Sequence, residues 1–88
     1  MVDFLSKVKA ALREEDVEGL IKLGAPADEY DSESKEIASA VGALNKNQFT
    51  EDNIVAVLAL VWTKSFHCLA EDIEKRMTAF HRIARSFL

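Results

Sequence analysis

The chain has 88 residues, of which 49% are hydrophobic and 30% charged, and a formal net charge of −4. These values fit one globular domain, residues 1–88, with a small core. The single cysteine, Cys68, excludes a disulfide-stapled secreted fold, and the acidic balance argues against nucleic-acid binding. The N-terminus does not resemble a signal peptide, and the apolar run from Ile54 to Trp62 is too short for a membrane span. We therefore expect a cytoplasmic protein that does not enter a membrane.

The charge is unevenly distributed along the chain. Residues 1–53 carry a net charge of −6, whereas residues 54–88 carry +2. Five acidic residues lie between Asp28 and Glu36, against the single base Lys35. An acidic front and a mildly basic tail can steer a charged partner during association.

The first half of the chain predicts three helical segments. Apolar residues recur at three- and four-residue spacing from about Asp3 to Glu14, and Asp3 can cap this helix. Asp16 is a candidate N-cap for a short second helix, which Gly24 would close. Asp31 is the expected N-cap of a third helix. The apolar face of the third helix is formed by Ile37, Val41 and Leu44.

The second half predicts two longer helices after a polar turn at residues 45–48. Thr50 is a candidate N-cap, and residues 54–61 are apolar on every side, which is typical of a central helix wrapped by its neighbours. A break is expected at residues 65–68, before a final helix from about Ala70 to Phe87. The predicted fold class is all-α, a compact bundle of four to five helices with short connections.

The acidic stretch after Pro26 is the candidate binding site. A turn followed by a capped helix would account for its acids. The alternative is a landing site for a basic partner surface, in which Tyr30 either anchors the interface or folds back over the core. A calcium loop is a third interpretation, but the central glycine and terminal glutamate of such a loop are absent. The candidate partner-binding residues are Asp28, Glu29, Tyr30, Asp31 and Glu33.

No motif indicates catalysis or a bound cofactor. His67 and Glu71 could share a helix face, but no further ligand has the spacing of a zinc site. Cys68 beside a histidine could act as a nucleophile, although a lone cysteine in a small helical domain is usually a packed apolar residue. We therefore expect no catalytic residues, no metal and no cofactor. The basic residues of the last helix are interpreted as a solvated face rather than as phosphate contacts: Lys75, Arg76, His81, Arg82 and Arg85.

Three segments resemble a small bacterial helical family catalogued as a domain of unknown function (number 1871). They are Gly24-Ala25-Pro26-Ala27-Asp28-Glu29-Tyr30-Asp31, the preceding Val17-Glu18-Gly19-Leu20 and the closing Phe80-His81-Arg82-Ile83-Ala84. The resemblance implies an all-α fold, no established activity and an association of such relatives with toxin–immunity loci. It favours a non-enzymatic immunity protein that binds a basic partner surface, such as a toxin nuclease domain. A small regulatory or structural adaptor is the alternative, and the chain could be a monomer or a homodimer.

Overall fold

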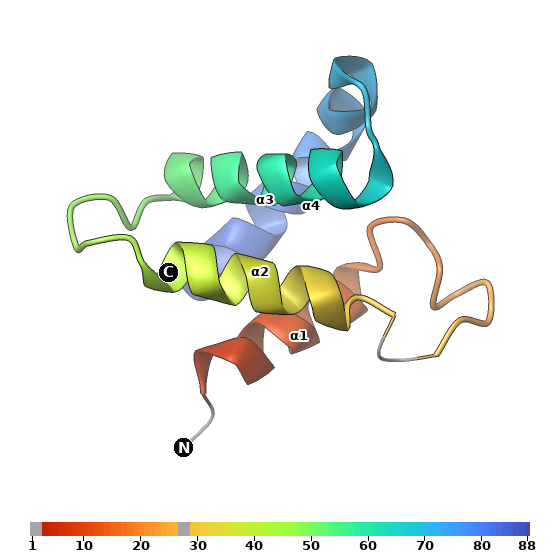
Figure 1. Cartoon of the computed structure of the whole chain (residues 1–88), viewed down its shortest axis with the longest axis horizontal. Helices are drawn as coiled ribbons and strands as arrows, with labels where there is room; N and C mark the ends of the chain where they lie inside the picture. Colours follow the sequence, from red (N-terminus) through yellow and green to blue (C-terminus); the bar gives the residue numbers. More distant parts are fainter. Residues whose placement is uncertain (1–2, 27–28) are drawn as a thin grey trace.

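The computed structural model describes residues 3–26 and 29–88, and these residues form four helices and no strand. The helices are α1 (Phe4–Glu15), α2 (Asp31–Gly42), α3 (Glu51–Phe66) and α4 (Ala70–Phe87). Figure 1 shows α2 lying between α1 and α3, with α4 crossing behind them. Because α4 packs against both α1 and α3, the four helices enclose one core. The predicted all-α bundle is confirmed.

The core is centred on the indole ring of Trp62 in α3. This ring is fully buried and meets the ring of Phe80 from α4 edge-on, with ring centroids 5.6 Å apart. Burying a large apolar side chain contributes about 1.5–3 kcal/mol. Every helix supplies such side chains to the core. The other fully buried apolar side chains are Val8, Leu12, Ile37, Val41, Ile54, Leu58, Ile83 and Ala84.

Two of the predicted helix caps are confirmed. The carboxylate of Asp3 accepts a hydrogen bond from the backbone N–H of Ser6 at 2.7 Å. The hydroxyl of Thr50 accepts one from the N–H of Asn53 at 3.3 Å. Each satisfies a backbone donor that the first turn of a helix leaves without an intrahelical partner.

The predicted helix after Asp16 is wrong. Residues 17–24 form consecutive turns, and Asp16 itself ends α1 with a left-handed φ of 45°. Positive φ angles also occur at Gly19 (69°) and Gly24 (108°), and α-helical geometry requires a negative φ. Gly24 does end a segment, as predicted, but that segment is a series of turns rather than a helix.

The predicted N-cap at Asp31 is also wrong. Asp31 is the first residue of α2, and the N-cap is Tyr30, whose side chain makes no capping hydrogen bond. Asp31 and Glu33 instead place negative charge in the first turn, where it interacts favourably with the helix dipole.

The expectation that α3 is wrapped on all sides is corrected by the structure. Ile54, Leu58 and Trp62 are fully buried, but Leu60 is 71% exposed. Only α2 and α4 pack against α3 among the described helices, so one face of this apolar helix lies open. None of the helices in residues 3–26 and 29–88 combines the length and the apolar character that crossing a membrane requires.

The cap at Thr50 can be tested directly. Thr50→Ala removes the acceptor for the Asn53 N–H, and we expect a loss of about 1 kcal/mol in the free energy of unfolding. Ser32→Ala, an exposed change in the first turn of α2, is the matched control and should stay within about 0.5 kcal/mol of wild type. Urea denaturation measures both, and equal stability of the two variants would contradict the assigned cap.

Candidate binding site

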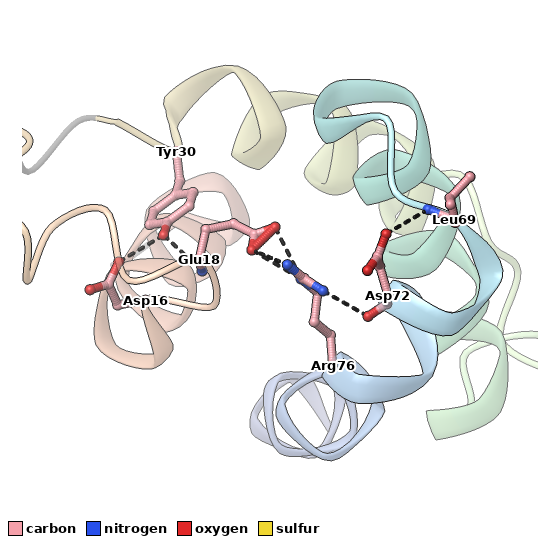
Figure 2. A network of polar contacts seen from close by, with 6 residues as sticks. All are labelled: Asp16, Glu18, Tyr30, Leu69, Asp72 and Arg76. Carbon is pink, nitrogen blue, oxygen red and sulfur yellow. Dashed lines mark hydrogen bonds and ion pairs between the residues drawn. The ribbon is translucent and has the colours of Figure 1, made fainter.

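Tyr30 is a core residue that also holds the polar centre of the candidate site. Its ring is 3% exposed and stacks on Trp62, with centroids 6.0 Å apart. Its hydroxyl donates a hydrogen bond to the Asp16 carboxylate at 2.7 Å and accepts one from the Glu18 N–H at 3.1 Å. Figure 2 shows Tyr30 pointing toward these two residues. The start of α2 is thereby bound to the end of α1.

The Asp16 carboxylate organises the turns that follow α1. It accepts hydrogen bonds from the backbone N–H groups of Ile21 at 3.1 Å and Lys22 at 2.9 Å, in addition to the Tyr30 hydroxyl. Partial desolvation alone would raise the pKa of Asp16. The hydrogen bonds outweigh this effect and hold the pKa below its usual value, because they favour the charged carboxylate.

A second polar contact joins the same turns to α4. The Arg76 guanidinium binds the Glu18 carboxylate, with Nη2 2.6 Å from Oε2 and Nε 3.0 Å from both oxygens. Arg76 also donates to the backbone carbonyl of Asp72 at 2.8 Å, and the Asp72 carboxylate accepts from the N–H of Leu69 at 3.0 Å. In Figure 2 these residues form a continuous network from the turns to the start of α4.

Three further basic residues of α4 bind acids from distant parts of the chain: His81, Arg82 and Arg85. Arg82 binds Glu15 at the end of α1, at 2.9 Å. Glu51, at the start of α3, accepts from Arg85 at 3.2 Å and lies 2.5 Å from the His81 ring nitrogen Nδ1. The interpretation of α4 as a solvated basic face is therefore incomplete, because Arg76, Arg82 and Arg85 pair within the chain.

The structure does not present the candidate partner-binding residues as one exposed surface. Asp28 lies outside the described residues. Glu29 is exposed, and Asp31 is partly exposed with a carboxylate oxygen 3.7 Å from the Lys9 ammonium. Tyr30 and Glu33 are buried, at 3% and 8% exposure, because both side chains turn from the start of α2 into the bundle. Of the two placements considered for Tyr30, the structure has it over the core.

The spacing of residues along α2 indicates the burial of Tyr30. Tyr30 lies four residues before Ser34, which lies three before Ile37, which lies four before Val41. This spacing is that of a single helix stripe, and all four residues are buried. The buried face of α2 therefore begins about two turns before Ile37, at the N-cap residue Tyr30. The acids on either side of Tyr30 mask this periodicity in the sequence.

Burial sets the protonation chemistry of Glu33. Desolvation raises the pKa of its carboxyl, and the negative charges of Glu36 and Glu29 raise it further. A hydrogen bond with the Ser65 side chain acts in the opposite direction. Burial and the neighbouring acids therefore both disfavour the charged form of Glu33.

The residues considered for metal or thiol chemistry do not form a reactive group. His67 ends α3 in a left-handed conformation (φ 53°), and Cys68 is buried beside it. Burial raises the pKa of the Cys68 thiol, which disfavours the nucleophilic thiolate. In the part of the chain that the structure describes, no three His, Cys, Asp or Glu residues are placed to hold a metal ion.

Comparisons with protein-family models, with curated proteins and with solved structures found no match for this chain. The resemblance to the family of unknown function therefore stays a prediction. The function has to be argued from the residues and their contacts.

The single tyrosine offers a spectroscopic test of the network. Burial, followed by the hydrogen bond to Asp16, raises the pKa of Tyr30 from 10.0 to about 12. The raised pKa means that the Tyr30 contribution to stability is complete below pH 10 and is lost as the pH rises through about 12. We expect the tyrosinate absorbance of the folded protein to titrate near pH 12. A midpoint near 10 in folded protein would contradict the assigned contacts.

Tyr30→Phe is the companion variant. It keeps the ring on Trp62 but removes the hydroxyl, and we expect a loss of about 1 kcal/mol in the free energy of unfolding at neutral pH. The variant should also lose less stability than wild type between neutral and strongly alkaline pH. Paired denaturation curves at both pH values measure this difference.

The buried carboxyl of Glu33 makes a separate prediction. A raised pKa stabilises the folded state below the unfolded pKa of 4.5, and that stability is lost as the pH rises through the folded value. Glu33→Gln should therefore raise the Tm by a few degrees at neutral pH, and its advantage should disappear in acid. Glu74→Gln, at an exposed position on α4, is the control and should change little at either pH. A lower Tm for Glu33→Gln at neutral pH would show that the charged form is favoured.

Proposed function

We propose that this chain is a non-enzymatic protein-binding domain that recognises a partner with a basic surface. More narrowly, we propose an immunity protein that neutralises a toxin domain. A toxin that acts on RNA or DNA needs a basic cleft, and an acidic surface on a small domain can occlude such a cleft. The proposal rests on the charge distribution and on the resemblance stated above.

The observation that carries the proposal is the pairing of the α4 arginines. Arg76, Arg82 and Arg85 are held by Glu18, Glu15 and Glu51. This pairing reduces the positive potential that a phosphate backbone would need. Near the start of α2, Glu29 and Glu36 are exposed, and the Glu36 carboxylate lies 3.7 Å from the Lys64 ammonium. We take this local group of acids as the surface that a basic partner would meet.

Exposure determines which residues carry the contact. Glu29 can meet a partner without changing the fold, and Asp31 can do so if it exchanges its contact with Lys9. Asp28 stays in the proposed contact set on the sequence alone. Tyr30, whose side chain is buried, acts by holding the start of α2 in place. The buried side chain of Glu33 cannot meet a partner without a change in the fold.

The proposal requires that a gene beside this one encodes a toxin, and the C-terminal domain of that toxin is the test partner. Glu29→Lys should slow association with that domain several-fold, most strongly at low salt, because exposed charges act mainly on the rate of encounter. Glu74→Lys makes the same charge change on the exposed face of α4 and should have a much smaller effect. Stopped-flow association rates at two salt concentrations measure both.

Two outcomes would contradict this function. Equal association rates for Glu29→Lys and wild type at low salt would show that Glu29 is not part of the binding site. Failure of wild type to bind that domain or to protect cells that express it would remove the immunity role. The alternative of a homodimeric adaptor is favoured by a different surface, the open face of α3.

A further inference from the structure

The outer face of α3 is uncovered in the single chain, and it carries the apolar residues Ala56 and Leu60 among polar and charged neighbours. Figure 1 shows α3 at the edge of the helical layer, and among the described helices only α2 and α4 pack against it. Exposed residues recur along this face at steps of four, in the order Asp52, Ala56, Leu60 and Lys64. A spacing of four places them in one row on the helix surface. Leu60, at the centre of the row, is 71% exposed.

This row is complementary to itself when it is reversed. A two-fold axis midway between residues 56 and 60 pairs α3 with a second, antiparallel α3. Leu60 then lies opposite Ala56 of the second copy, and Asp52 lies opposite Lys64 of the second copy. Each large apolar side chain meets a small one, and each charge meets its opposite. A two-fold interface requires this kind of self-complementarity.

The side chains on the row are available for such pairing. Lys64 is 3.7 Å from Glu36, but its side chain is 74% exposed, and an ion pair of this kind in water is weak. Alanine opposite leucine allows two helices to approach to the interaxial distance of about 8–10 Å that packed helices adopt. Val57 and Ala59, which are partly buried, border the row and extend its apolar area.

We propose that the outer face of α3 binds a second copy of this chain, forming an antiparallel α3–α3 dimer with Asp52–Lys64 pairs at both ends. This surface touches α2 only through the contact between Lys64 and Glu36 that was described above, and its row holds one acid and one base, so it has no net charge. Its association rests on Leu60 and Ala56 rather than on the acids near the start of α2. The dimer therefore does not depend on the toxin-binding proposal. Its small apolar area suits a weak dimer that forms at high protein concentration.

Sedimentation equilibrium of the full chain tests the dimer. Wild type should self-associate as the concentration approaches about 1 mM, the range of weak complexes. Leu60→Lys should be monomeric throughout, because it places charge at the centre of the apolar row. Leu23→Lys makes the same change outside α3, at a residue that is 83% exposed. This control variant should dimerise as wild type does.

A charge exchange tests the antiparallel register. Asp52→Lys alone puts two positive charges opposite each other at both ends of the dimer, and Lys64→Asp alone does the same with negative charges. Each variant should raise the dimer dissociation constant by roughly tenfold or more. An equimolar mixture of the two variants restores opposite charges at both ends, so the mixture should dimerise although neither variant does so alone. Circular dichroism melts confirm that each variant is folded.

Three results would overturn the proposal. If wild type stays monomeric up to about 1 mM, the α3 face does not bind a second copy of the chain. A dimer that survives Leu60→Lys would lie on another surface. Single charge variants that associate as well alone as in the mixture would rule out the antiparallel pairing.

Discussion

The hydrogen bond from the Tyr30 hydroxyl to the Asp16 carboxylate is the contact on which the arrangement of the first half depends. It joins the end of α1 to the start of α2 across 14 residues, at 2.7 Å. The same carboxylate holds the N–H groups of Ile21 and Lys22, so one acid orders the turns and receives the tyrosine. The ring of Tyr30 then fixes α2 against Trp62 in α3. A single side chain thus links the apolar core with the polar network.

The uneven charge of the sequence is partly explained by contacts within the chain. The acidic first 53 residues contribute Glu15, Glu18 and Glu51, and the basic last 35 contribute the arginines that bind them. Glu18 and Arg76 form the closest of these pairs, at 2.6 Å, and both side chains are largely buried. Partners that meet at reduced solvent exposure interact more strongly than exposed pairs, but they also lose hydration. Such contacts position α4 on the bundle more than they add net stability.

The features that could be predicted from the sequence are those set by neighbouring residues. The caps at Asp3 and Thr50, the polar turn at 45–48 and the span of α4 all follow from local spacing. The Asp16 carboxylate does accept backbone N–H groups, as an N-cap does, but the positive φ of Gly19 prevents a helix after it. The partners of Arg76 and Arg82 lie 58 and 67 residues away, and no local pattern encodes such distances.

The edge-on contact between Phe4 in α1 and Phe87 in α4, with centroids 5.3 Å apart, has a consequence for folding during synthesis. Phe4 leaves the ribosome 83 residues before its ring partner. The apolar face of α1 can meet α2 early, but its contacts with α4 must wait until α4 has emerged. Helices α1 to α3 therefore spend part of their synthesis with the α4 side of Trp62 uncovered, and chaperone contact is most needed during that interval.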